Sequence, residues 1–289
     1  MMPRAVSAAT SPESASGAAA AWIENCQSNH LRCRKVSSTW RPTRLIYVGK
    51  PTQGANPRLC LSSSIPTDIQ YTTLSHCWRS IEFFKLLSSN LQSLMESIPI
   101  EQLSKAIQDA IVLTRRIGIE YIWIDSLCIV QDSSEDWTRE SEMIGDVYKH
   151  SWVNISATGF ENDSAGLFTR RSPSLLLPVK INLNIQDSSR REPCVVSKDR
   201  YYCLEDFWDV SVTTAPLIPR AWVFQERLLA PRVLHVGESQ MLWECRELEA
   251  SEMFPVSTTN RFKKRFKSVF SAVEDLSKEH RDIAVALEI

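Results

Sequence analysis

Apolar strand patterns and helical patterns alternate between residues 71 and 159, and this order limits the fold more than any other feature. Strand patterns at 71–78, 119–125 and 151–159 are separated by helical patterns at 101–118 and 133–150. Connections of this length suit the crossovers between parallel strands. The sequence therefore predicts a doubly wound α/β core, in which helices flank a parallel sheet.

Local signals support the limits of the two helices. Gly118 follows the periodic apolar positions of the first helix, where a left-handed residue commonly ends a helix. Ser133 stands three residues before Asp136, which resembles a capping box at the start of the second helix. A further helix is expected after Pro219, followed by a β-hairpin over 232–245.

The main domain is expected to span residues 71–246. Residues 1–18 are rich in Ala and Ser and predict a disordered tail. Residues 19–70 predict a short helix over 20–35 and a hairpin of two strands that leads into the core. Residues 247–289 predict an amphipathic helical segment, in which five of the seven residues 261–267 are basic.

Composition restricts the partners and the compartment. The net charge is -1, so no overall positive field attracts nucleic acid, and no nucleic-acid partner is expected. No apolar run reaches the roughly 18–20 residues that span a bilayer. The start of the chain has no continuous secretory apolar region, so a cytoplasmic protein is expected. The eight cysteines are therefore expected to be reduced thiols.

In doubly wound sheets, ligands gather beyond the carboxyl ends of the strands. The first strand brings Ser75 and Trp78 to this edge, and the second brings Asp125. The stretch "RAWVFQERLLAPRVLH" adds Trp222 and Glu226, four residues apart on one helix. These positions make Ser75, Trp78, Asp125, Trp222 and Glu226 the candidate residues of a ligand site.

The segments "YTTLSHCW", "YIWIDSLCIVQDSSEDWTRESEMIGDVYKHSWVNISA", "GLFTRR" and "RAWVFQERLLAPRVLHVGESQMLWEC" resemble the heterokaryon incompatibility (HET) domain of filamentous fungi. The resemblance covers about residues 71–246. His76 and Arg79 stand where such domains usually have Tyr and Gly. The resemblance implies a role in non-self recognition, in which HET domains trigger cell death when genetically different cells fuse.

HET domains are distantly similar to TIR domains, whose flavodoxin-like fold carries NAD cleavage in several members. TIR enzymes have a Glu four residues after a Trp, which is the spacing of Trp222 and Glu226. The resemblance thus implies that NAD is a substrate rather than a cofactor, and that Glu226 is the catalytic residue that assists its cleavage. The same resemblance implies the substrate-binding residues, which are Ser75, Trp78, Asp125 and Trp222. It also implies a homo-oligomer, or a partnership with another HET or NLR-type signalling protein.

Other interpretations stay open. Glu226 is also explained as a structural acid near the start of a helix, where the helix dipole favours negative charge. The protein is then a non-enzymatic signalling module that self-associates. A third hypothesis is an inactive, truncated paralogue that ends early at Ile289.

Two further groups of residues have less support as sites. Cys77 is a candidate thiol nucleophile only if a base such as His235 reaches it, since the adjacent His76 points to the opposite face of a strand. Cys26, His30 and Cys33 share a helical face, and Cys60 is a conceivable fourth zinc ligand. Their spacing lacks the paired ligands usual in structural zinc sites, so a packing face is favoured and no metal is predicted.

Overall fold

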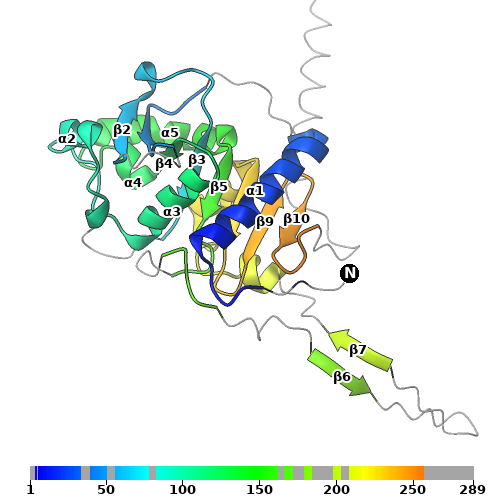
Figure 1. Cartoon of the computed structure of the whole chain (residues 1–289). Coiled ribbons are helices and arrows are strands. Elements are labelled where there is room, and N and C mark those ends of the chain that lie inside the picture. Colours follow the sequence, from blue (N-terminus) through cyan, green and yellow to red (C-terminus); the bar gives the residue numbers. More distant parts are fainter. Residues whose placement is uncertain are drawn as a thin grey trace, which may run out of the picture.

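The structure of the 289-residue chain is a computed structural model. It describes residues 4, 6–33, 40–50, 56–77, 83–161, 166–171, 179–183, 198–202 and 208–256. Most of the described residues belong to one layered body with a central sheet and helices on both faces (Figure 1).

The helices are α1 (Pro12–Asn29), α2 (Leu91–Glu96), α3 (Lys105–Arg116), α4 (Asp125–Cys128), α5 (Ser134–His150) and α6 (Ala221–Leu229). The strands are β1 (Arg44–Tyr47), β2 (Arg58–Leu61), β3 (Tyr71–Ser75), β4 (Tyr121–Trp123), β5 (Val153–Ser156), β6 (Val179–Leu183), β7 (Lys198–Tyr202), β8 (Arg232–Val236), β9 (Met241–Cys245) and β10 (Glu249–Ser251). Short turns of helix are η1 (Leu31–Cys33), η2 (Ser62–Ser64), η3 (Ile100–Gln102) and the π-helical η5 (Asp209–Thr213).

Eight strands form one sheet in the order β10-β9-β8-β5-β3-β4-β1-β2, and β6 and β7 form a separate antiparallel pair. The central strands β8, β5, β3 and β4 are parallel, as predicted. The outer strands are antiparallel, because the hairpins β1–β2 and β8–β9–β10 extend the sheet at both edges. The doubly wound α/β prediction is therefore confirmed for the core, and the whole sheet is mixed rather than parallel.

Among the parallel strands alone, chain order gives the arrangement 2-1-3-4, which is the order that begins a flavodoxin-like sheet. The chain leaves β3 toward one side to form β4 and then returns past β3 to form β5. The connections therefore diverge between β3 and β5. At such a switch point, the carboxyl ends of neighbouring strands leave a crevice that suits a ligand.

The two faces of the sheet are covered by different helices. The Thr72 hydroxyl lies 2.8 Å from that of Thr114 in α3, whereas the Tyr71 hydroxyl donates to the carbonyl of Val147 in α5, at 2.7 Å. Neighbouring residues of β3 thus face opposite helices, as the pleat of a strand requires. Helix α1 packs beside α3, and α6 packs beside α5.

The predicted end of α3 and the predicted start of α5 agree with the structure, whereas the predicted start of α3 is wrong. The hydroxyl of Ser133 accepts a hydrogen bond from the backbone N–H of Asp136 at 3.2 Å and caps α5. Gly118 has a φ of 82°, which is the left-handed conformation that favours glycine after a helix. Ser104 caps α3 in the same way, so this helix begins at Lys105 rather than at Glu101.

Two of the predicted boundaries are wrong where the structure describes them. Residues 12–18 are helical rather than disordered, because α1 begins at Pro12 and buries Ala15 and Ala19 against the core. Residues 249–251 form β10 rather than part of a helix. The predicted amphipathic helix from residue 257 onward lies outside the described residues.

Candidate functional site

The carboxylate of Glu226 lies where α6 packs against α5 and the end of β3. The hydroxyl groups of Ser75 and Tyr148 face this carboxylate and stabilise its charged form. Each also has a second acceptor, which is the Asn154 amide oxygen at 3.2 Å for Ser75 and the Leu74 carbonyl at 3.5 Å for Tyr148. The Glu226 Oε2 atom is shut off from solvent and has no hydrogen-bond partner in the part of the chain that the structure describes. A buried carboxylate oxygen without a partner is costly, so a hydrogen-bond donor that reached this atom would be stabilising.

Ser75 is held in place by the neighbouring strand. The side-chain amide of Asn154, in β5, donates to the Ser75 hydroxyl oxygen at 2.9 Å. The Thr73 hydroxyl donates in turn to the amide oxygen of Asn154, at 3.1 Å, which sets the orientation of the amide. The proton of the Ser75 hydroxyl has two acceptors in reach, the Asn154 amide oxygen at 3.2 Å and the Glu226 carboxylate.

Asp125 opens α4 directly after the end of β4, and its Oδ1 atom accepts a hydrogen bond from the backbone N–H of Ser126 at 2.7 Å. Burial and the nearby negative charge of Glu226 raise the pKa of Asp125 to about 8. Burial also raises the pKa of Glu226, although the Ser75 and Tyr148 hydrogen bonds and the charge of Arg220 oppose that effect. The two carboxyl groups therefore form an interacting pair that resists carrying two charges.

Arg220 is the positive group of the site. It stands at the N-cap of α6, and its Nη1 atom donates to the backbone carbonyl of His76 at 3.3 Å. Burial and the Arg220 charge lower the pKa of His76 to about 4, so this imidazole is neutral at physiological pH. The positive charge of Arg220 thus favours a bound anion and disfavours a second positive charge, such as that of a protonated His76.

Of the other predicted substrate-binding residues, the structure describes only Trp222, and its ring is not brought to the carboxylate pair. Trp222 is 62% exposed on α6, so its ring points mainly to solvent although it lies one helical turn before Glu226. Trp78 lies outside the described residues, as does Arg79. Ser75, Asp125 and Glu226 are the predicted site residues that the fold gathers.

The thiol alternative gains no support from the described residues. Cys77 is buried against Leu217 and Val223. His235 is buried elsewhere, with its Nδ1 atom 2.8 Å from the Thr158 hydroxyl and its Nε2 atom 3.1 Å from a carboxylate oxygen of Glu244. Both ring nitrogens are therefore engaged in the core, which argues against His235 as the base for Cys77.

Sequence reasoning missed Tyr148, Asn154 and Arg220 as site residues. Tyr148 lies in the helical pattern at 133–150, and its hydroxyl gives no signal of its own in the sequence. Asn154 is a polar residue inside a strand that is buried at all four positions. This last feature was a usable signal, since a buried amide must be hydrogen-bonded and so points to a polar network.

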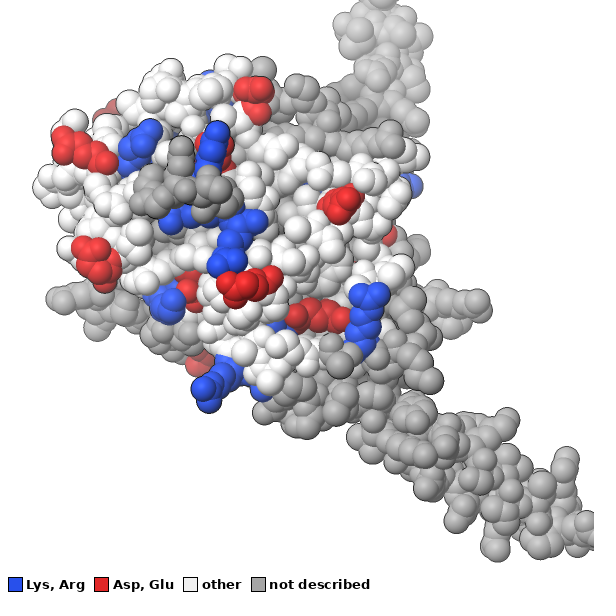
Figure 2. Space-filling model, in the orientation of Figure 1, with Lys and Arg blue, Asp and Glu red and all other residues white. Residues whose placement is uncertain are grey.

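The surface of the molecule is mixed in charge. Acidic and basic side chains are interspersed over the face drawn in Figure 2, without a broad area of one sign. Among the described residues, no helix combines the length and the apolar character needed to cross a membrane.

Fold and site together define an α/β protein with carboxylates gathered at the switch point of its parallel strands. The model of the heterokaryon incompatibility protein (HET) family matches residues 71–226, and the chain belongs to this family. The match begins with β3 and ends at Glu226. No curated protein and no solved structure matches the chain. Family membership implies a role in heterokaryon incompatibility and the cell death that accompanies it.

Proposed function

We propose that this protein acts in fungal non-self recognition by cleaving NAD at the bond between nicotinamide and ribose. The observation that carries the proposal is the environment of Glu226. Its carboxylate faces the hydroxyl groups of Ser75 and Tyr148, has one buried oxygen without a partner among the described residues, and lies beside Asp125. Such a carboxylate is suited to a reaction that develops positive charge on a sugar.

The reaction breaks the N-glycosidic bond, and the bonding electron pair leaves with nicotinamide as a neutral molecule. Positive charge then develops on the ribosyl carbon and its ring oxygen. The negative charge of Glu226 stabilises this cation, and the buried Oε2 atom accepts a hydrogen bond from a ribose hydroxyl. Water adds to the carbon and releases a proton, which gives ADP-ribose.

Asp125 and Glu226 hold one proton between them at neutral pH, so each carboxyl group has a distinct role. The leaving group needs no proton, so the reaction requires one ionised carboxylate. With a pKa of about 8, Asp125 holds the proton at pH 7. The Ser75 and Tyr148 hydroxyls and the Arg220 charge favour the ionised form of Glu226 against the effect of burial, so we assign the negative charge of the pair to Glu226. Arg220 lies near both groups and is the candidate ligand for a phosphate of NAD.

The test is nicotinamide release from NAD by the purified full chain, compared with Glu226→Gln. The matched control is Glu142→Gln, which changes an exposed acid in the middle of α5. We expect release by the wild type and the control, and a loss of at least about 100-fold in Glu226→Gln, since a removed transition-state charge interaction typically costs this much. Circular dichroism confirms that each variant is folded.

Equal release by Glu226→Gln and the wild type contradicts the assignment of Glu226. An absence of release from a folded wild-type protein, tested both dilute and concentrated, contradicts NAD cleavage altogether. In that second case the role of the family must be carried by assembly rather than by catalysis.

Assembly is the second candidate function, and exposed aromatic residues favour it. Trp137 on α5 is 53% exposed and Trp222 on α6 is 62% exposed, on two helices that pack beside each other. Exposed Trp residues are enriched at protein interfaces.

The candidate partners are a second copy of the chain or another HET or NLR-type signalling protein. Sedimentation of the wild type and Trp222→Ala tests the first: a concentration-dependent oligomer that the variant lacks supports it.

A further inference from the structure

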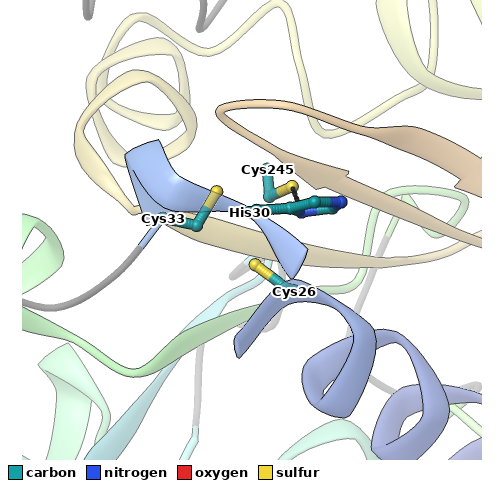
Figure 3. A group of neighbouring side chains, drawn as sticks. All are labelled: Cys26, His30, Cys33 and Cys245. Carbon is teal, nitrogen blue, oxygen red and sulfur yellow. Dashed lines mark hydrogen bonds between the residues drawn. The ribbon is translucent and has the colours of Figure 1, made fainter. Parts of the chain in front are cut away.

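Four side chains with metal-binding atoms meet where the end of α1 lies beside β9. Cys26 comes from the last turn of α1, His30 follows that helix, Cys33 belongs to η1, and Cys245 ends β9 (Figure 3). One ligand atom from each of the four lies within 4.8 Å of every other. Figure 3 shows the three sulfur atoms and the imidazole converging on a common space.

We propose that Cys26, His30, Cys33 and Cys245 bind one structural Zn²⁺ ion. Three cysteines and one histidine are a common donor set of structural zinc sites, in which zinc is tetrahedral. With Zn–S bonds of about 2.3 Å, neighbouring ligand atoms of a tetrahedron are about 3.8 Å apart. Small side-chain rotations therefore close the observed group around an ion.

The local backbone explains how the three N-terminal ligands converge. Cys26, His30 and Cys33 do not share one helical face, so the prediction from their spacing is wrong. Helix α1 ends at Asn29, and the backbone of His30 leaves the helix in an extended conformation before η1 forms. The break turns His30 and Cys33 back toward Cys26. The fourth residue is Cys245, and Cys60 in β2 is not a member of the group.

The hairpin that carries Cys245 resembles the turns that hold thiolate ligands. The backbone N–H of Leu248 donates to the Cys245 sulfur at 3.2 Å, and the His30 Nδ1 atom lies 3.4 Å from the same sulfur. Backbone N–H groups that donate to sulfur stabilise its thiolate form and fix its direction toward a metal. Cys26, Cys33 and Cys245 are all free thiols rather than members of a disulfide.

Arg232 provides the matching charge. It is 1% exposed, its Nε atom donates to the Cys26 sulfur at 3.3 Å, and a guanidinium N–H donates to the carbonyl of Cys33 at 2.7 Å. Within the described ranges, no carboxylate lies within ion-pair distance of Arg232. A Zn²⁺ ion with three thiolates and a neutral imidazole has a charge of -1. Arg232 balances this charge, and a buried cation requires such a partner.

The ion has a structural role that is separate from NAD cleavage. Its ligands flank the HET match, because three precede residue 71 and the fourth follows residue 226. Zinc thereby joins the end of α1 to the last hairpin of the sheet. The three cysteines are buried and leave no open coordination position of the kind that catalytic zinc needs.

The test measures zinc in the full chain, purified under reducing conditions without chelator. We expect one zinc per chain by elemental analysis, in the wild type and in the matched control Cys60→Ser. We expect Cys33→Ser and Cys245→Ser to lose zinc or bind it at least about 10-fold more weakly. His30→Cys replaces one ligand by another, keeps four ligands in total, and is expected to retain zinc.

Cobalt gives a second readout on the unmodified chain, which needs no variant to fold. Replacement of zinc by Co²⁺ is expected to produce intense visible absorption of a tetrahedral ion and a thiolate charge-transfer band. The proposal is overturned by either of two results: less than one zinc per ten chains after reconstitution with Zn²⁺, together with no tetrahedral cobalt spectrum; or equal loss of zinc in Cys60→Ser and Cys245→Ser.

Discussion

Burial and the negative charge of Glu226 together raise the pKa of Asp125 to about 8. The folded protein therefore keeps a proton on Asp125 over a pH range in which an unfolded chain, with an ordinary Asp pKa of about 3.9, has released it. Because the folded state binds more protons than the unfolded state in this range, stability must fall as pH rises through it.

The first prediction concerns this pH dependence. Between about pH 5 and pH 8, we expect the wild type to lose stability more steeply than Asp125→Asn, by up to about 1.4 kcal/mol for each pH unit, which is the limit for one proton. Urea denaturation at several pH values measures the difference. Asp68→Asn, at an exposed position, is the control and should run parallel to the wild type. Parallel curves for Asp125→Asn would show that this carboxyl group is ionised normally.

The second prediction separates the positioning of Glu226 from its chemistry. Tyr148→Phe removes a hydroxyl that faces the Glu226 carboxylate and stabilises its charged form. A hydrogen bond to a charged group contributes about 1.5–3 kcal/mol, so the pKa of Glu226 should rise by about one to two units. If Glu226 must be ionised, the acid limb of the kcat profile for nicotinamide release moves to higher pH by the same amount.

The control for this experiment is Tyr47→Phe, since the ring of Tyr47 packs against that of Tyr121 in the distant β1–β4 pair. A uniform fall of kcat at every pH in Tyr148→Phe, without movement of the limb, would assign Tyr148 a packing role only.

The order of the core elements was predictable because each signal is local. The cap of Ser133 on α5 and the left-handed Gly118 depend only on residues within one turn of helix. The alternation of strands and helices then leaves few topologies, since crossovers between parallel strands are long and right-handed. Ser75 and Asp125 were found in this way, as residues at the carboxyl ends of two strands.

The rest of the site depends on contacts between distant segments. Trp222 and Glu226 share a helical spacing, but only the packing of α6 against α5 decides that Glu226 is covered and Trp222 is exposed. Cys245 joins Cys26 because β9 lies beside α1, where Trp22 and Trp243 stack at 6.2 Å. Cys26 and Cys245 are more than 200 residues apart, and no local pattern in a single sequence links residues at that separation.

The third prediction concerns the buried ion pair that joins β1 to α5. The Arg44 guanidinium donates to both carboxylate oxygens of Asp136, at 2.7 and 2.9 Å, and to the carbonyl of Cys128 at 3.0 Å. Arg44→Met removes the buried guanidinium from Asp136 and leaves the half-exposed Arg139 as its remaining cationic partner. Loss of one partner of a buried ion pair costs up to about 3–5 kcal/mol in the free energy of unfolding, and we expect a loss toward the lower end of this range because Arg139 remains. Urea denaturation at pH 7 measures it.

Arg58→Met is the matched control, because Arg58 lies on the neighbouring strand and is exposed over the Tyr47 ring. We expect it to change stability by less than about 1 kcal/mol. Similar effects of the two substitutions would mean that the Arg44 pair contributes no more than a surface contact.

The last prediction concerns Gly166, the glycine of the segment "GLFTRR". Gly166 has a φ of 74°, and a Cβ atom at this position would lie 2.5 Å from a carboxylate oxygen of Asp109. The same oxygen accepts hydrogen bonds from the backbone N–H groups of Leu167 and Phe168, at 2.8 and 3.2 Å. The close approach of backbone to carboxylate therefore requires glycine. Gly166→Ala should cost at least about 1–2 kcal/mol from the left-handed backbone alone.

The same glycine-to-alanine substitution at Gly17 should have the opposite effect on stability. Gly17 lies inside α1, and a Cβ atom there meets nothing within 4 Å. Alanine favours a helix interior over glycine by about 0.5–1 kcal/mol, so this variant should be more stable than the wild type. Thermal denaturation of both variants measures the contrast. If Gly166→Ala also gains stability, the carboxylate of Asp109 does not hold this loop as the structure describes.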